Sequence, residues 1–322
     1  MLVALAFAAV AGPVAAIAQQ PRKPPRVGIL TPADSVETAI FEAFRAGLHD
    51  LGYVEGRNLI LEFRLAHGDA ALLPRFAMEL ASIPVDVIVA DGGAAVRSAM
   101  AATKRIPIVM GGPGGDPVAL GIAASLARPG GNVTGTYPMQ AELCAKRLEI
   151  LRLAFPQISA VAMLLSTSNA ASPVNFRASE EAARSLGLLT VAHVDADTPE
   201  ALLALRPTVF ADANAVAILP DPMFWNHRRD VLAVVDAARL PAIYPEREYV
   251  DDGGLMAYGA NIPDIYRRLA SYVDRILKGA NPGDLPIEQP VRFDFVVNLK
   301  TAQKLGLTIP SSILDRADEV IE

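Results

Sequence analysis

The chain has 322 residues, of which 52% are hydrophobic and 20% are charged, and its formal net charge is -6 at pH 7. This length suits two ordinary domains, each with enough apolar side chains for a core. The acidic balance argues against a nucleic-acid partner, because no basic stripe is present to neutralise phosphates.

The first twenty residues, MLVALAFAAVAGPVAAIAQQ, carry no charge and end the apolar run at Ala16-Ile17-Ala18. A small-x-small pattern followed by polar residues is typical of a signal-peptidase site. We therefore expect residues 1–18 to be an export signal, cleaved near Ala18, and the mature chain to be periplasmic; the alternative is a short anchor or a buried helix. Cys144 is the only cysteine, so the sequence offers neither an internal disulfide nor a lipid-attachment cysteine at that position.

Strand and helix patterns alternate along the first half of the mature chain. Strands are predicted at residues 25–30, 58–66, 85–90 and 105–110, and helices at 36–53 and 94–104. Asp116-Pro117 has the composition of a helix start, with Asp116 as N-cap and Pro117 as the first helical residue. Short apolar strands alternating with helices predict a mostly parallel sheet that is covered on both faces.

The second half repeats this order. Strands are predicted at 159–165, 188–196, 214–220 and 240–244, with helices at 176–187 and 227–239 and a loop around 221–225. Three pairs of landmarks keep a nearly constant offset: Val27 and Val161 are 134 positions apart, Leu51 and Leu186 are 135 apart, and Pro107 and Pro241 are 134 apart. The sequence therefore predicts an α/β fold of two similar, doubly wound, Rossmann-like lobes.

Ligands of open parallel sheets bind beyond the carboxyl ends of the strands. The loops at these ends are 31–35, 91–93 and 111–117 in the first half, and 166–175, 220–225 and 244–246 in the second. Because Asp, Ser, Asn, Gly and Pro also serve as ordinary caps and turns, each single loop has a purely structural interpretation. Their repetition favours a ligand site between the lobes.

The glycine-rich segment GGPGGDPV, residues 111–118, does not fit a nucleotide site. Counting from Gly112, the sixth position of a dinucleotide fingerprint is Pro117 instead of glycine, and no Gly-Lys-Ser/Thr follows. A carboxylate at the predicted helix start would also repel a phosphate.

Catalytic and metal-binding patterns are also missing from the sequence. There is no G-x-S-x-G elbow, and the four histidines lie far apart without the spacing of metal ligands (His49, His67, His193 and His227). We therefore expect no catalytic residues, no metal and no cofactor, and a chain that is not an enzyme.

The remaining chemistry is binding by backbone amides, hydroxyls and carboxylates. Helix N-termini offer N–H groups to a ligand carboxylate, and Asp116 or Asp221 suits an ammonium group. Four aromatic residues are candidates to stack on a ligand, or else belong to the core: Phe224, Trp225, Tyr244 and Tyr258. This set favours an amino acid or an aromatic acid.

Several long stretches resemble one known family. They are FRAGLHDLGYVEGRNLILEFRLAHGD (44–69), IPIVM followed by GDPV, RPGGNVTG (128–135), residues 219–259, residues 266–310 and the closing LDRADEVIE. On these stretches the chain resembles the TrpX-like family of ABC-transporter substrate-binding proteins, which are type I periplasmic binding proteins.

The resemblance implies two lobes joined by a three-strand hinge, with the ligand enclosed between them by hinge closure. Lobe 1 would comprise residues 26–136 plus 261–288, and lobe 2 residues 137–260 plus 289–322. The resemblance further implies a monomer that delivers its solute to an ABC permease and its ATPase. The same lobes would also suit a receptor that presents a solute to a membrane sensor protein; an α/β enzyme is the weaker alternative.

Carried over by position, the resemblance implies that these residues bind the ligand: Asp34, Ser35, Gly92, Gly93, Ala94, Asp116, Pro117, Ser168, Asn169, Asp221, Pro222, Tyr258 and Asn261, to which Tyr244 is added from the loop pattern. The chain has Gly92-Gly93-Ala94 where many relatives have Thr-Pro-Ala, and GGPGG where they have a shorter lead into Asp-Pro. This departure leaves the ligand open among tryptophan, tyrosine-like compounds and other small acids.

Overall fold

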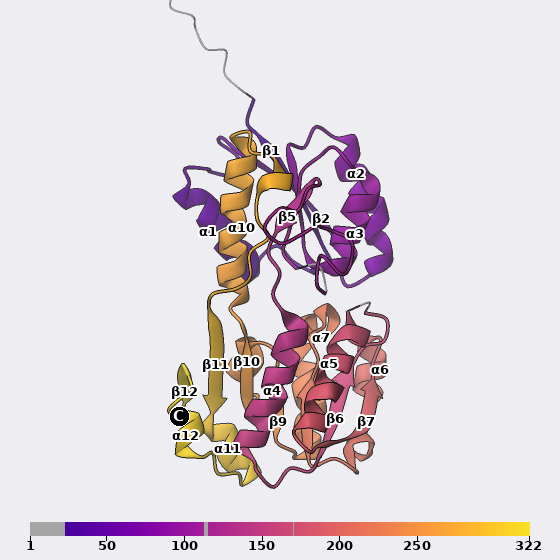
Figure 1. The fold of residues 1–322 in the computed structure, drawn as a ribbon, viewed down its shortest axis with the longest axis vertical. Coiled ribbons are helices and arrows are strands. Elements are labelled where there is room, and N and C mark those ends of the chain that lie inside the picture. The colour runs from indigo at the N-terminus through magenta and orange to yellow at the C-terminus, as the bar shows by residue number, and fades with distance from the viewer. Residues whose placement is uncertain (1–22, 113–114, 170) are drawn as a thin grey trace, which may run out of the picture.

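Two sheets organise the chain, one in each lobe (Figure 1). The structure is a computed structural model that describes residues 23–112, 115–169 and 171–322, so the export signal expected at 1–18 lies outside the described residues. Within those ranges, no helix combines the length and the apolar character that crossing a bilayer requires.

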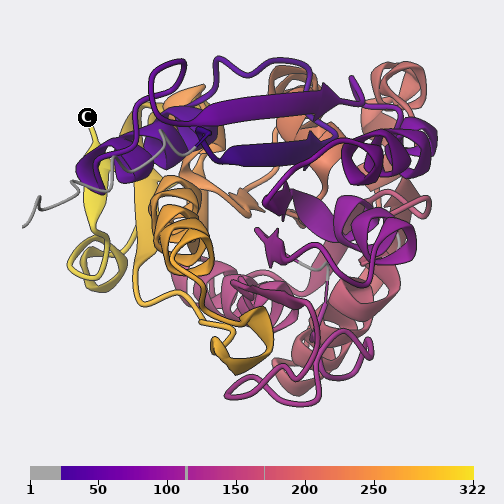
Figure 2. The same cartoon turned by 90° about the horizontal axis from the view of Figure 1, so that it is seen from above.

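The sheet of lobe 1 has five parallel strands in the order β2-β1-β3-β4-β5. The strands are β1 (Arg26–Thr31), β2 (Ile60–Leu65), β3 (Val87–Ala90), β4 (Ile108–Met110) and β5 (Val133–Gly135). Helices α1 (Ala39–Asp50) and α10 (Ile262–Leu277) lie side by side on one face, and α2 (Leu73–Ser82) and α3 (Gly92–Ala102) cover the other (Figures 1 and 2). Two short 3-10 turns complete the lobe, η1 (Ala70–Leu72) and η3 (Pro282–Asp284).

Alternate side chains of each strand enter different cores. In β3, Val87 and Val89 pack on the α1 and α10 side, whereas Ile88 and Ala90 pack on the α2 and α3 side. Successive strand residues point to opposite faces, and both faces are covered, so the inner strands β3 and β4 are apolar throughout, whereas the edge strand β2 carries Glu62 and Arg64. This double burial is the reason that the inner strands were predictable from uninterrupted apolar runs.

The sheet of lobe 2 has seven strands in the order β12-β11-β10-β9-β8-β6-β7, with β11 antiparallel to β10 and the other pairs parallel. The strands are β6 (Ala160–Leu165), β7 (Leu189–Asp195), β8 (Ala215–Ile218), β9 (Ala242–Tyr244), β10 (Met256–Ala260), β11 (Phe293–Asn298) and β12 (Glu319–Ile321).

Two hydrophobic cores flank this second sheet. One contains side chains of α4 (Gln140–Ala154), α5 (Ser172–Ser185), α11 (Leu299–Leu305) and α12 (Ser311–Leu314). The other contains side chains of α6 (Pro199–Ala204), η2 (Pro207–Phe210), α7 (Pro222–Asn226), α8 (Arg228–Ala238) and α9 (Arg247–Asp251).

The landmark pairs occupy equivalent places in the two lobes. Val27 and Val161 lie in β1 and β6, each of which pairs with a parallel strand on either side. Leu51 and Leu186 are the C-caps of α1 and α5. The carbonyl groups of Pro107 and Pro241 accept equivalent hydrogen bonds of 2.9 Å, from Ile88 N and Val216 N. The predicted pair of doubly wound lobes is confirmed.

The connections between the lobes orient the strand ends. β5 leads directly into α4 of lobe 2, β10 leads directly into α10 of lobe 1, and the segment after η3 returns to β11. Because β1, β3 and β4 run parallel to β5, their carboxyl ends point toward lobe 2. Because β6, β8 and β9 run parallel to β10, their carboxyl ends point toward lobe 1. The two sets of ends therefore face one another (Figure 1).

One local prediction is wrong: no α-helix follows Asp116-Pro117. The segment makes a single turn in which Leu120 N donates to Asp116 O at 2.9 Å, and Gly121 then takes a left-handed conformation with φ of 67°. Glycine adopts this conformation without the steric cost borne by other residues, so the chain leaves the helical path there. Two smaller differences are that α3 begins at Gly92 instead of residue 94, and that the loop expected around 221–225 contains the short helix α7.

Candidate functional site

Asp91 is the central polar residue at the strand ends of lobe 1. It follows β3, and its Oδ2 accepts a hydrogen bond of 2.7 Å from Thr31 Oγ1 at the end of β1. Its Oδ1 accepts a hydrogen bond from the Tyr266 hydroxyl of α10. Burial raises the pKa of Asp91, and the two hydrogen bonds oppose that rise. The carboxyl group is thus held away from the helix that it precedes.

As a consequence, α3 begins without a side-chain cap among the described residues, although Asp91 is its N-cap residue. The first turn consists of Gly92, with φ of 79°, followed by Gly93 and Ala94, all half-buried. The first N–H groups of a helix have no partner within it and form its positive end. These three predicted site residues therefore present to lobe 2 a helix start whose N–H groups suit an anion.

The other predicted residues of lobe 1 lie in loops, and all except Pro117 are exposed. Asp34 and Ser35 follow β1, where Ser35 Oγ accepts from Glu37 N at 3.0 Å. Asp116 is exposed, and its Oδ1 accepts from Val118 N at 2.8 Å, while Pro117 is buried.

The GGPGGDPV segment touches the Asp91 group at its start. A Cβ atom on Gly111 would lie 3.0 Å from the Tyr266 hydroxyl, tighter than most contacts of that kind. Pro113 and Gly114 lie outside the described residues. The first glycine of the segment is therefore explained by packing beside the Asp91–Tyr266 pair.

In lobe 2, Asp197 holds the loop after β6. Its Oδ1 accepts from Ser166 Oγ and from Ser168 N, both at 2.7 Å. These hydrogen bonds, led by that from the Ser168 backbone, lower the pKa of Asp197 to about 2. The next residue, Asn169, donates through Nδ2 to Asp221 Oδ2 at 2.8 Å, so two predicted residues from different loops are brought together.

Asp221 ends the segment after β8 and is 8% exposed. Its Oδ1 accepts from Met223 N at 2.8 Å and from Phe224 N at 3.2 Å, which caps α7, with the exposed Pro222 in the first turn. Burial raises the pKa of Asp221 despite these hydrogen bonds. A buried carboxylate in this position favours a cation nearby.

A second buried carboxyl group, Glu246, is close enough to Asp221 for their charges to interact, and it was not among the predicted residues. It follows β9, is 8% exposed, and burial raises its pKa to about 8, with Arg147 opposing the rise and Glu248 and Asp221 adding to it. Beside this acidic pair, the buried hydroxyl of Tyr249 has no hydrogen-bond partner within the described residues. The loop 244–246 was predicted to face the ligand, but nothing in its sequence indicated a buried acid.

Arg147 fixes the backbone of this region. From α4 its Nε donates to Tyr258 O at 2.7 Å, and its Nη2 donates to Pro245 O at 3.3 Å and to Gln140 Oε1 at 3.1 Å. The side chain is 2% exposed. It thereby ties α4 to the ends of β9 and β10, a role that no local pattern in a helical sequence reveals.

Tyr258 and Asn261 lie where the chain crosses from β10 of lobe 2 to α10 of lobe 1, which we call the lobe crossing. Tyr258 is half-buried and stacks on Phe293 with ring centroids 6.0 Å apart. Asn261 caps α10 by accepting from Asp264 N and donates to Asp294 Oδ2, both at 2.8 Å.

Tyr244 is not brought together with the other predicted residues. Its ring is 3% exposed, stacks on Tyr249 at 5.1 Å, and lines a separate pocket of lobe 2. Of the other candidate aromatic residues, Phe224 is fully buried in the lobe 2 core and Trp225 packs against that core.

The facing ends therefore carry opposite electrostatic preferences. Lobe 1 offers the uncapped start of α3, whereas lobe 2 offers the buried carboxyl groups of Asp221 and Glu246. Across residues 23–112, 115–169 and 171–322, no group of three or more His, Cys, Asp or Glu side chains is placed to hold a metal ion. The arrangement suits a small molecule with both an anionic and a cationic group.

Comparison with known proteins assigns the chain to a family. Residues 28–321 match the model of the ABC transporter substrate binding protein family. A tyrosine-binding protein of Clostridioides difficile is 25% identical over 266 residues, which cover 83% of this chain and 76% of that protein. Members of this family are substrate-binding proteins of ABC transporters, not enzymes.

Solved structures show the same fold. A conserved domain protein from Vibrio cholerae superposes with a TM-score of 0.86 at 24% identity, covering 92% of this chain and 100% of the other. An ABC domain from Streptococcus pneumoniae in complex with L-Trp superposes with a TM-score of 0.82, also at 24% identity and with the same coverage. The fold is that of the type I periplasmic binding proteins, and the chain belongs to the ABC transporter substrate-binding protein family.

Proposed function

We propose that this chain binds a small zwitterionic solute, with an aromatic amino acid favoured, between its lobes and delivers it to an ABC permease from the periplasm. The family works with a membrane permease and its ATPase and acts outside the cytoplasm. The proposal adds three properties to those of the family: the solute class, the periplasmic location after removal of residues 1–18, and a monomeric state.

The observation that carries the proposal is the charge complementarity of the facing strand ends. The start of α3 in lobe 1 lacks a side-chain cap within the described chain, which suits a ligand carboxylate. Asp221 and Glu246 in lobe 2 are buried carboxyl groups whose pKa values are raised by burial, and an ammonium group would stabilise their charged forms. An amino acid carries both groups.

Two relatives favour an aromatic side chain. One is named for tyrosine binding, and another was solved with L-Trp. In this chain Tyr258 is half-buried at the lobe crossing, where its ring can stack on a ligand ring. The proposed ligand-facing set comprises Asp34, Ser35, Gly92, Gly93, Ala94, Asp116, Pro117, Ser168, Asn169, Asp221, Pro222, Tyr258 and Asn261, to which Glu246 is added.

A thermal-shift screen of amino acids, aromatic acids and small carboxylates, followed by calorimetry with the strongest hit, tests the proposal. We expect amino acids to stabilise the chain, by about 2.7 kcal/mol at one hundred times the Kd. Replacing Asp221 with Asn keeps an N-cap residue for α7 but removes the charge. A charge-assisted hydrogen bond contributes about 1.5–3 kcal/mol, so Asp221→Asn should weaken binding about 10- to 100-fold.

Asp230→Asn is the matched control, because Asp230 lies on α8 and pairs only with His227 among the described residues. Its affinity should equal that of the unmodified chain. Equal affinity of Asp221→Asn and Asp230→Asn, both folded, would remove Asp221 from the binding site.

A further inference from the structure

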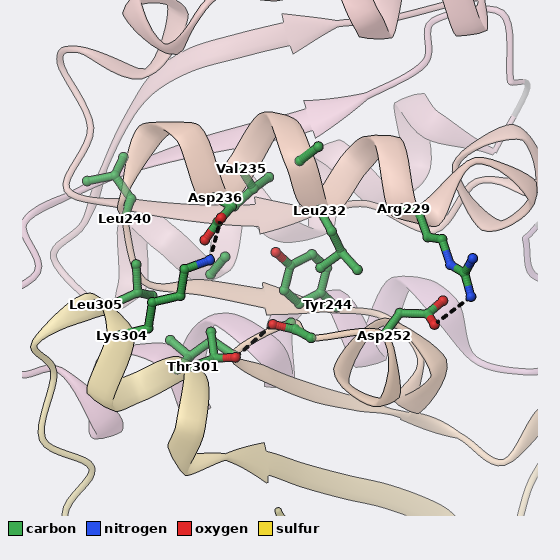
Figure 3. Close-up of a pocket in the computed structure, with 15 residues that line it drawn as sticks. Arg229, Leu232, Val235, Asp236, Leu240, Tyr244, Asp252, Thr301, Lys304 and Leu305 are labelled. Carbon is green, nitrogen blue, oxygen red and sulfur yellow. Dashed lines mark hydrogen bonds and ion pairs between the residues drawn. The ribbon is translucent and has the colours of Figure 1, made fainter.

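Lobe 2 contains a pocket that is separate from the proposed solute site between the facing strand ends. It has a volume of about 270 Å³ and lies between α8, the turn after α9, and α11 (Figure 3). It is bounded by α8 and by the residues that lead into β9 and β10, so most of its lining lies toward the amino ends of the strands, away from lobe 1. Its lining includes Leu232, Ala233, Asp236, Tyr244, Lys304 and Leu305.

The charged groups around the pocket are paired with one another. Lys304 Nζ lies 2.7 Å from Asp236 Oδ2, and Arg229 Nη2 lies 3.4 Å from Asp252 Oδ1, as the dashed lines in Figure 3 show. Because each charge already has an opposite neighbour, the rim offers no unpaired charge to an ion. An uncharged occupant is therefore favoured.

The lining is mixed: paired charged groups and aliphatic side chains share it, and the Tyr244 hydroxyl adds a hydrogen-bonding group. Leucine, valine and alanine side chains line the walls, and the ring of Tyr244 lies between them with its hydroxyl directed into the pocket (Figure 3). Among the described residues this hydroxyl has no hydrogen-bond partner, although the side chain is 97% buried. Burial, together with the charge of Asp236, raises the pKa of Tyr244, so the hydroxyl remains a donor at neutral pH.

The position of the Tyr244 ring depends on a neighbouring glycine. A Cβ atom on Gly254 would lie 2.8 Å from Tyr244 Cε2 and 2.9 Å from Tyr249 O, so only glycine leaves room for the ring there. On its other side the ring stacks on Tyr249 with an interplanar angle of 18°. The hydroxyl is thus held in a fixed direction.

We propose that this pocket binds a small uncharged organic molecule with an apolar body and one hydrogen-bond acceptor, independently of the solute between the lobes. The volume is sufficient, since an apolar protein cavity of about 150 Å³ can already hold benzene. The Tyr244 hydroxyl donates to the acceptor, and the leucine side chains cover the apolar body.

Benzyl alcohol is the probe, titrated into the full chain while the methyl resonances of Leu232 and Leu305 are followed by NMR. We expect saturable shifts of these methyl groups. A neutral hydrogen bond contributes about 1 kcal/mol, so Tyr244→Phe should weaken binding about fivefold, whereas toluene, which lacks the acceptor, should bind both proteins equally.

Ala233→Trp provides a second test that leaves Tyr244 intact. Ala233 is exposed on α8 and lines the pocket, so the indole should fill it and abolish the shifts. Ala237→Trp is the control, because Ala237 is exposed on the same helix and does not line the pocket. Amino-acid affinity should be the same in both variants.

Three results would overturn the proposal. The first is an absence of saturable shifts at Leu232 and Leu305. The second is benzyl alcohol affinity that is equal in Ala233→Trp and Ala237→Trp. The third is competition between benzyl alcohol and the amino acid, which would place the probe between the lobes instead.

Discussion

Asp221 and Glu246 occupy similar positions, each after a strand of lobe 2, but only the first could be predicted. Asp221 precedes a proline, and Asp-Pro at a strand end is a recognisable helix start, which the structure contains as the capped α7. Glu246 is polar in sequence and buried only because α4, carrying Arg147, packs over the end of β9. Burial imposed by distant segments leaves no local pattern.

The raised pKa of Glu246 makes stability depend on pH. Its folded pKa is about 8, against an ordinary value of 4.5, so between these values the unfolded chain releases a proton that the folded chain retains. The protonated Glu246 carboxyl therefore makes its full contribution to the free energy of unfolding below pH 4.5. This contribution is lost as pH rises toward 8. Glu246→Gln cannot ionise, so relative to the unmodified chain it should gain at least about 1.4 kcal/mol between pH 4.5 and pH 9.

Urea unfolding at several pH values measures this difference, with Glu181→Gln on the exposed face of α5 as the control. The groups that act on Glu246 are Arg147, which favours its charge, and Glu248 and Asp221, which oppose it. Parallel pH profiles for the unmodified chain and Glu246→Gln would mean that Glu246 does not titrate in this window.

At the scale of elements, strands were more predictable than the segments that follow them. The inner strands are buried on both faces and read as apolar runs, whereas the single turn after Asp116 has the same start signal as a true helix. Gly121 and the return of the chain to β5 decide that this segment forms a turn instead of a helix. Both lie further along the sequence than the capping residues at the start of the segment. Tyr244 shows the same limit: its strand was predicted, but the room for its ring depends on Gly254, which is distant in sequence.

Gly259 in β10 gives a test at this scale. A Cβ atom there would overlap the backbone carbonyl oxygen of Pro245, the same oxygen that Arg147 binds. The methyl group of an alanine can avoid this overlap only if β9 and β10 move apart. Gly259→Ala should therefore destabilise the chain by about 2 kcal/mol or more. Gly131→Ala is the control, since nothing lies within 4 Å of its Cβ position, and it should change stability by less than about 0.5 kcal/mol. Equal denaturant midpoints for the two variants would contradict this packing argument.

At the scale of the whole molecule, the two-lobed design follows from the internal repeat and from the three crossings. The repeat was visible in the sequence because equivalent strands and caps kept their spacing. The way in which the strand ends face one another was not, since it depends on β5 and β10 each running on into the opposite lobe. A solute that contacts both lobes only when they are closed favours the closed state by its differential affinity.

The central claim is that the solute is a zwitterion held through both of its charges. Calorimetric titration of the chain with the twenty L-amino acids, and then with the deaminated and decarboxylated counterparts of the tightest one, tests it most directly. We expect one-to-one binding of that amino acid and at least about tenfold weaker binding of both counterparts, because each loses a charge-assisted hydrogen bond. A folded chain that binds no amino acid, or that binds the deaminated counterpart equally well, would contradict it.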